Sequence, residues 1–170
     1  MNTMKQKVIQ KKLPREVYNA LKSVVGEQWI YEQRSVVETY SKLSIEGFSY
    51  ITKHEKDPHV LPACGVLPAS TEEIQTIVRI CNRYHVPFIP FTNGQVFCNP
   101  TTPDPTLIIH LSRMNKIIHI DVENMNATLE AYVDYGQLQS ETMKRGLWNG
   151  GSPLATSLCK LASQFAFAGL

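Results

Sequence analysis

Residues 65–91 carry the sharpest folding signal in the chain. Ser70 is followed three positions later by Glu73, the spacing of a capping box, which begins a helix by satisfying its first free N–H groups. Pro87 ends the helical stretch because proline disfavours helical backbone at and before its own position, and a short apolar run typical of a strand follows. With the extended residues 65–68 in front, the segment predicts a β-α-β unit. The residues expected on the apolar face of the helix are Ile74, Ile77, Val78 and Cys81.

The rest of the chain extends this unit into an α+β fold. Two further helices are predicted before it, over residues 14–25, between Pro14 and Gly26, and over residues 35–42. After it, the order β-α-β-β-β-α predicts one mixed sheet with helices packed on it. The later elements begin with extended runs at 106–110, 116–120 and 127–133, of which the last two are expected to pair as a hairpin. A helix over 135–145 follows, with Leu138 and Met143 expected to face inward, and it ends at Gly146.

Charge and composition exclude several classes of protein. The net charge of +2 is too small to indicate a nucleic-acid partner, and no apolar run is long enough for a membrane span. The N-terminus leads into no apolar signal segment, and four scattered cysteines form no zinc spacing, so we expect a cytoplasmic protein without a structural metal. His110 and His119 lie on predicted strands and are interpreted as structural, as is Cys98.

Two polar turns with glycine stand out as candidate ligand loops. Residues 92–95 (TNGQ) follow the predicted strand at 88–91, and residues 149–153 (NGGSP) precede a small-residue apolar run. Glycine lets backbone N–H groups approach an anion closely, but Asn-Gly is also a common turn dipeptide, and locally the plain turn is favoured. Neither turn fits the dinucleotide fingerprint or the P-loop. Since no Ser/His/Asp set is recognisable, a bound cofactor would have to supply any chemistry, and the catalytic residues are unknown.

The order of three longer segments resembles a known flavoprotein family. They read VLPASTEEIQTIVRICNRYHVPFIPFTNGQ, TLIIHLSRMNKIIHIDVENMNATLEAYVDYGQLQSETMKRGL and NGGSPLATSLCKLASQFAFAGL. Together they resemble the N-terminal FAD-binding domain of the vanillyl-alcohol-oxidase / p-cresol-methylhydroxylase family, which includes glycolate-oxidase and D-lactate-dehydrogenase-like enzymes. The resemblance divides the chain into a helical lead-in segment (residues 1–59) and the first lobe of a PCMH-type FAD-binding domain (residues 60–170), which we expect to be incomplete.

The resemblance assigns the pyrophosphate of FAD to two loops. Lys160 stands where the family often has glycine, as does Tyr132, and Lys160 could offer the pyrophosphate a positive charge. Gln95 stands where some members carry the histidine that attaches the flavin, so we expect FAD to be bound non-covalently there. The implied cofactor-binding residues are Phe91, Thr92, Asn93, Gly94, Gln95, Gly151, Ser152, Pro153, Thr156, Ser157, Lys160 and Ala162.

The function implied is that of the FAD-binding portion of a flavin-dependent oxidoreductase. The whole enzyme would oxidise a small-molecule substrate, a 2-hydroxy acid or a phenolic or other alcohol, by hydride transfer to FAD. The apolar residues 165–170 predict contact with more of the same polypeptide or with a partner subunit. The alternative is a non-catalytic subunit or scaffold that keeps the fold with a degenerate flavin site, which the missing glycines favour.

Overall fold

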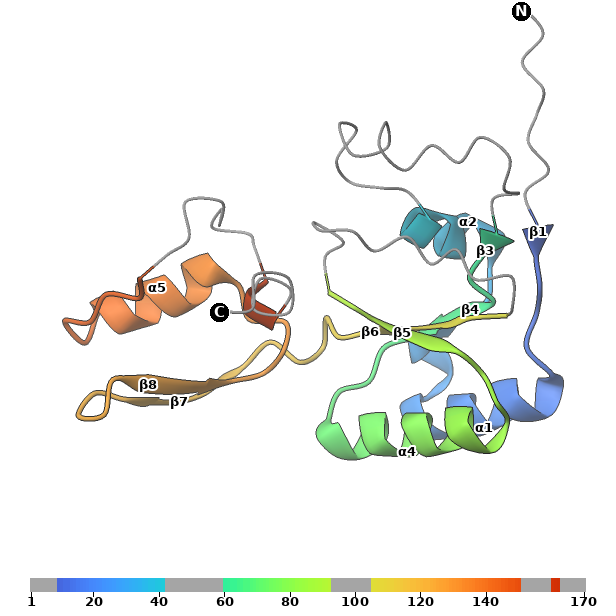
Figure 1. Ribbon diagram of the computed structural model, residues 1–170, viewed down its shortest axis with the longest axis horizontal. Coiled ribbons are helices and arrows are strands. Elements are labelled where there is room, and N and C mark those ends of the chain that lie inside the picture. Colours follow the sequence, from blue (N-terminus) through green and yellow to red (C-terminus); the bar gives the residue numbers. More distant parts are fainter. Residues whose placement is uncertain (1–8, 42–59, 93–104, 151–159, 163–170) are drawn as a thin grey trace, which may run out of the picture. The chain divides into compact units, whose positions relative to one another are not determined.

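The computed structural model of the chain describes residues 9–41, 60–92, 105–150 and 160–162. It separates into two compact units, Met1–His110 and Leu111–Leu170, which are considered one at a time (Figure 1). The boundary that the sequence predicts between the lead-in segment and the FAD-binding domain, at residues 59 and 60, stays a prediction. Described strands on both sides of that position pair with one another within the first unit.

The first unit is built on a mixed four-stranded sheet with the order β2-β4-β6-β5 (Figure 1). β4, β5 and β6 run parallel, and β2 runs antiparallel to β4. The central β6 is buried at three successive positions, as expected for a parallel strand covered on both faces. The strands are β2 (Ile30–Tyr31), β4 (Cys64–Val66), β5 (Phe88–Phe91) and β6 (Leu107–His110), with a separate parallel pair β1 (Ile9–Gln10) and β3 (Val60–Leu61).

The predicted capping box begins helix α4 (Thr71–Arg83). The Ser70 hydroxyl accepts a hydrogen bond from the Glu73 N–H at 3.2 Å, and the Glu73 carboxylate accepts one from the Ala69 N–H at 2.7 Å. Ile77 and Cys81 of the predicted apolar face are buried. The β-α-β unit is therefore confirmed, with one difference: β4 and β5 are not neighbours, because β6 lies between them.

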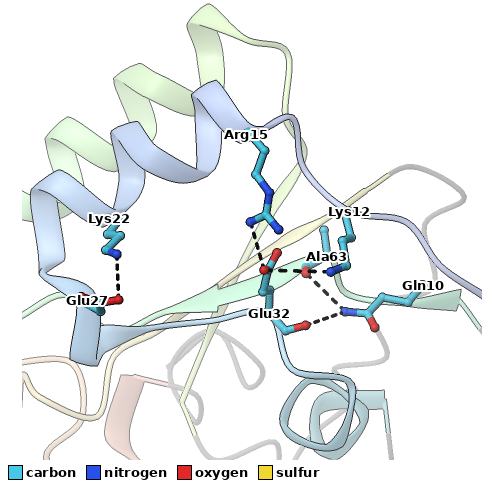
Figure 2. Close-up of polar contacts among 7 residues, drawn as sticks. All are labelled: Gln10, Lys12, Arg15, Lys22, Glu27, Glu32 and Ala63. Carbon is cyan, nitrogen blue, oxygen red and sulfur yellow. Dashed lines mark hydrogen bonds and ion pairs between the residues drawn. The ribbon is translucent and has the colours of Figure 1, made fainter.

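The described part of the lead-in segment packs against this unit. Helix α1 lies beside α4 on one side of the sheet, and its predicted start and stop residues are confirmed (Figure 1). The Glu32 carboxylate pairs with Arg15 at 3.0 Å, and the Gln10 amide donates to the Glu32 carbonyl at 3.1 Å (Figure 2). The elements are α1 (Arg15–Val25), the 3-10 turn η1 (Glu27–Trp29), α2 (Arg34–Val37) and the 3-10 turn η2 (Glu38–Ser41).

The second unit contains the predicted hairpin and a helix. β7 (Ile117–Asp121) pairs antiparallel with β8 (Asn126–Leu129), and α5 (Tyr135–Met143) follows. Val133, Leu138 and Leu161 form its small core.

Two details of the sequence prediction are wrong. Among the described residues, the strands expected in a single sheet are assigned to a four-stranded sheet, to the β1–β3 pair and to the β7–β8 hairpin. Met143 was expected to face inward but is 59 % exposed, whereas Thr142 is buried. The reason is angular: Thr142 lies four residues after the buried Leu138 and shares its helix face, and Met143 lies five residues after it. Gly146 closes the turn with φ of 72°, as predicted.

Candidate functional site

The strongest candidate site in the first unit is the edge at which its parallel strands end. Since β4, β5 and β6 run in the same direction, their last residues Val66, Phe91 and His110 lie at one edge of the sheet. Open sheets with parallel strands bind ligands beyond these carboxyl ends. Phe91 and Thr92, both predicted to bind the cofactor, lie at this edge.

Three rings from distant parts of the chain meet there. The ring of Tyr40, in η2, lies 4.9 Å from that of Phe91 and 5.6 Å from that of His110, and Phe91 and His110 lie 5.2 Å apart, all measured between centroids. The three pairs are close to perpendicular, the edge-to-face arrangement that aromatic quadrupoles favour. The Tyr40 hydroxyl also forms a hydrogen bond with Nδ1 of His110 at 3.0 Å. We call Tyr40, Phe91 and His110 the aromatic triad.

His110 also contacts the start of the predicted phosphate loop. Burial lowers the pKa of His110 below its usual value of 6.5, and a hydrogen bond with the Thr92 backbone partly opposes this shift. The imidazole is therefore neutral at pH 7, and its Nδ1 forms the hydrogen bond with Tyr40. His110 is interpreted as structural from the sequence; in the structure its ring contacts Tyr40 of the lead-in segment and Phe91 at the end of β5.

In the second unit, Lys160 is already engaged by two neighbours. Its ammonium lies 3.3 Å from the Asp134 carboxylate and 4.2 Å from the centroid of the Tyr132 ring. Asp134 also caps α5 by accepting from the Gln137 N–H at 2.7 Å. Much of the positive charge expected to meet a pyrophosphate is thus compensated within the protein.

The predicted site residues fall into three groups. Phe91 and Thr92 lie together at the end of β5 in the first unit. Lys160 and Ala162 lie in the described piece 160–162 of the second unit, where the Leu161 N–H bonds the Val133 carbonyl. The predicted residues that lie outside the described parts of the chain are Asn93, Gly94, Gln95, Gly151, Ser152, Pro153, Thr156 and Ser157.

Sequence reasoning did not single out Tyr40. Its partner His110 is 70 positions away, and a tyrosine near the end of a short predicted helix reads as an ordinary core residue. The signal that the sequence offers at this position is an aromatic ring with a hydroxyl group, which needs a hydrogen-bond partner when it is buried. That signal does not identify the partner.

The strand end offers what an anionic cofactor group needs. A pyrophosphate is held by N–H and O–H donors. Thr92 carries a hydroxyl, and the neighbouring aromatic triad brings no negative charge at neutral pH. Gly150, beside the second predicted loop, has open space where a side chain would begin, so a ligand can approach its backbone. Taken separately, Thr92 in the first unit and the open backbone of Gly150 in the second each suit a phosphate group chemically, and Lys160, paired with Asp134, suits it less directly.

The described thiols offer no nucleophile. Cys64 and Cys81 are free and buried, and burial raises their pKa values to about 12 and about 11. Both remain protonated near pH 7 and behave as small core residues, as predicted for Cys81.

A cleft of about 430 Å³ lies in the second unit between β7 and α5. Glu141, its acidic lining residue, is paired with Lys144 at 2.5 Å and with Arg145 at 3.0 Å. The lining residues are Ile117, Ile118, His119, Ile120, Gln137, Glu141 and Arg145. Nothing in this set distinguishes it from an ordinary polar surface groove.

Comparison with known proteins identifies the family. A family model described as "FAD binding domain" matches residues 62–166. The mitochondrial D-lactate dehydrogenase (cytochrome) of Kluyveromyces lactis is 27 % identical over 115 residues, covering 65 % of this chain and 20 % of that protein. Two solved structures share the fold, each at 22 % identity. An alkyldihydroxyacetonephosphate synthase matches with a TM-score of 0.77, and the match covers 98 % of this chain and 31 % of that protein. The p-cresol methylhydroxylase matches with a TM-score of 0.65, and the match covers 78 % of this chain and 25 % of that protein.

The chain thus spans about a fifth of the length of this relative. Within the described residues, no helix is both long and apolar enough to cross a membrane. The matched residues include β4, α4, β5, β6, the hairpin and α5, in the order that the sequence predicted. The chain belongs to the FAD binding domain family, which confirms the resemblance and the cofactor that it implied.

Proposed function

We propose that the chain is the FAD-binding portion of an FAD-dependent oxidoreductase. The observation that carries the proposal is the match of the FAD binding domain model to residues 62–166. The fold supports it, because the predicted pyrophosphate residues Phe91 and Thr92 lie at the carboxyl ends of parallel strands.

The proposed reaction is oxidation of a 2-hydroxy acid or of a phenolic or other alcohol. FAD, when bound, accepts a hydride from a substrate C–H bond. The residues of this chain bind and orient the cofactor: the loop that begins at Phe91 and Thr92, and the loop that ends near Lys160, hold its pyrophosphate without a covalent bond. We assign no acid or base among them, and the substrate pocket belongs to other parts of the whole protein.

The partners follow from the same proposal. A small molecule is the substrate, and residues 165–170 contact more of the same polypeptide or a partner subunit. The two buried free thiols are compatible with the reducing cytoplasm, which stays a prediction.

One observation favours the alternative of a non-catalytic scaffold. The Lys160 ammonium, expected to help hold the pyrophosphate, is instead bound by Asp134 and Tyr132. A protein of this kind would keep the fold and lose the cofactor.

Cofactor binding separates the two proposals. The polypeptide from the complete reading frame that encodes these residues is purified and titrated with FAD, and with riboflavin and ADP as probes of the two ends of the cofactor. We expect a yellow complex with FAD, weaker binding of ADP, and no binding of riboflavin, which lacks the pyrophosphate. A folded, colourless protein that leaves added FAD free would establish the scaffold instead.

A matched pair of variants tests the site itself. Thr92→Val removes the hydroxyl at the end of β5 while keeping the shape of the side chain. Thr128→Val makes the same change on the exposed face of β8. We expect only Thr92→Val to weaken FAD binding, and equal affinity in both variants would remove Thr92 from the site.

A further inference from the structure

We propose that Asn149 is a site of spontaneous deamidation, promoted by the hydroxyl of Tyr135. The backbone nitrogen of Gly150 attacks Cγ of the Asn149 side chain, the Cγ–Nδ2 bond breaks, and ammonia leaves with the proton of the Gly150 N–H. Water then opens the cyclic imide at either of its carbonyls and gives aspartate or isoaspartate. The reaction needs no oxidant and no cofactor, so the inference is independent of the proposed function.

The sequence supplies a dipeptide in which this ring closure meets little steric resistance. A side chain on the following residue crowds the attacking nitrogen and restricts its backbone, and glycine does neither. Asparagine is among the thermolabile residues for this reason. Asn-Gly occurs twice in the chain, as Asn149-Gly150 and as Asn93-Gly94, which lies outside the described residues.

The attacking group of Gly150 is open to solvent. Gly150 is exposed, and nothing lies within 4 Å of the point where a side chain would begin. The backbone bonds of the turn after α5 reach only as far as the Leu147 N–H, which donates to the Thr142 carbonyl at 3.0 Å. No described residue accepts a hydrogen bond from the Gly150 N–H. Hydroxide can therefore reach this proton, and no helix or strand ladder holds the backbone there.

The leaving group of Asn149 is not restrained by a hydrogen bond. Its Nδ2 has no partner among the described residues. Asn124, in the turn of the hairpin, is the contrast: its Nδ2 donates to the Asp121 carboxylate at 2.7 Å, and its backbone N–H donates to the same carboxylate at 3.0 Å. The residue after it is Met125, whose side chain crowds the attacking nitrogen. Asn124 should therefore resist the reaction that Asn149 undergoes.

Tyr135 adds a contribution that the dipeptide alone does not have. Its hydroxyl donates to the Asn149 carbonyl at 2.5 Å, and its ring is fixed by packing against the small core of the second unit. That carbonyl oxygen shares the negative charge that forms when the Gly150 N–H loses its proton, because both belong to one conjugated peptide group. A donor aimed at developing charge lowers the barrier, as in an oxyanion hole. One hydrogen bond of this kind corresponds to a factor of about two to ten in rate.

The product introduces a charge at a place where the sequence has none. Residues 149–153, the second candidate ligand loop, contain no charged side chain. Aspartate and isoaspartate both place a carboxylate at its first position, and isoaspartate also lengthens the backbone there. The modification therefore changes the electrostatics of this loop.

The test follows the reaction in the polypeptide of the complete reading frame, incubated at mildly alkaline pH and sampled over time. Trypsin cleaves after Arg145 and Lys160, and the peptide between them has Asn149 as its only amide side chain. Mass spectrometry and labelling by an isoaspartate-specific methyltransferase measure its conversion, and the peptide that contains Asn124 is the internal control.

Three variants are compared with wild type, each folded and unfolded in urea. Gly150→Ala places a side chain beside the attacking nitrogen, and Tyr135→Phe removes the hydroxyl while keeping the ring. Tyr31→Phe is the matched control, because it removes a hydroxyl that bonds a different carbonyl, that of Gln28.

We expect Asn149 to convert faster than Asn124 in the folded wild type, and Gly150→Ala to suppress this conversion. Tyr135→Phe should slow it by a factor of about two to ten in the folded protein and have no effect in urea, where the contact is lost. Tyr31→Phe should leave it unchanged in both. A folded wild type that keeps Asn149 intact while the unfolded chain converts overturns the inference. A rate in folded Tyr135→Phe that equals or exceeds that of wild type overturns the role of Tyr135.

Discussion

The ammonium of Lys160 lies 3.3 Å from the carboxylate of Asp134, a residue 26 positions earlier in the chain. The two residues also form an antiparallel backbone bridge, and their side chains are only 13 % and 23 % exposed. The pair therefore joins the N-terminus of α5 to the described piece 160–162. Removing one partner of a salt bridge sheltered to this degree costs more than doing so on an open surface, because the other charge is left without compensation.

The first prediction concerns this pair. Asp134→Asn removes the charge but keeps a side chain that can cap α5, and we expect it to lower the free energy of unfolding by about 1–2 kcal/mol. Lys160→Met should cost a similar amount, and the double variant little more than either. Urea unfolding of the four proteins measures the coupling. Glu141→Gln is the control, because its Lys144 partner is 64 % exposed, and a loss as large there would contradict the argument.

The helix cap at Ser70 supports a second prediction. Ser70→Ala removes the acceptor of the Glu73 N–H and should destabilise the first unit by about 1 kcal/mol. Ser23→Ala, an exposed change in α1 where the hydroxyl bonds the Ala20 carbonyl, should be neutral or slightly stabilising because alanine is the better helix former. Thermal unfolding of the two variants distinguishes a helix cap from a serine inside a helix. Equal melting temperatures would show that the Ser70 hydroxyl does not stabilise α4 as a cap.

Two glycines four residues apart give a third prediction. Gly146 has φ of 72°, which a side chain disfavours, whereas Gly150 meets open space and has no such backbone. Gly146→Ala should therefore lower the free energy of unfolding by about 1 kcal/mol. Gly150→Ala should leave it nearly unchanged. If chemical denaturation instead shows equal losses, the turn after α5 does not depend on the left-handed backbone of Gly146.

The lowered pKa of His110 gives a fourth prediction, on pH. The unfolded chain takes up a proton near pH 6.5 while folded His110 stays neutral to lower pH, so the unfolded state binds more protons in that window. Stability is fully present above pH 6.5 and falls as the pH drops below it toward the folded-state pKa. Melting temperatures between pH 5 and pH 7.5 measure this.

The matched variants for this prediction are two histidine substitutions. His110→Asn should flatten the profile, while His119→Asn, at an exposed position of β7, should leave it as in wild type. An unchanged slope in His110→Asn would show that another group titrates.

Much of the fold was readable because its signals are local. The capping box at Ser70, the break at Pro87, the polar turn of the hairpin and the stop at Gly146 each act through residues a few positions apart, and each was predicted from the sequence. The strand order could not be predicted in this way, because no local feature of β4 or β5 indicates that β6 lies between them in the sheet. The apolar character of Met143 predicts an inward side chain, but its angle on the helix turns it to solvent, and α5 buries Thr142 instead.

The candidate site shows the same difference between what sequence segments indicate and what depends on tertiary contacts. Phe91, Thr92 and the later loop residues came from the resemblance, which compares whole segments. The contact of Tyr40 with His110 could not come from either source, because it joins a 3-10 turn to the end of a strand 70 positions later. Likewise, the charge of Lys160 was visible in the sequence, but its neutralisation by Asp134 depends on a tertiary contact.

The position of β6 has a consequence for the order in which the chain can fold. β4 and β5 each pair with β6 and not with one another, so the sheet cannot close until Leu107–His110 has left the ribosome. Until then, two apolar strands each present an unpaired edge, which is the feature that recruits strands from other molecules. A nascent chain that pauses before residue 107 therefore exposes both of these edges, and α4, capped at Ser70, connects the two strands that carry them.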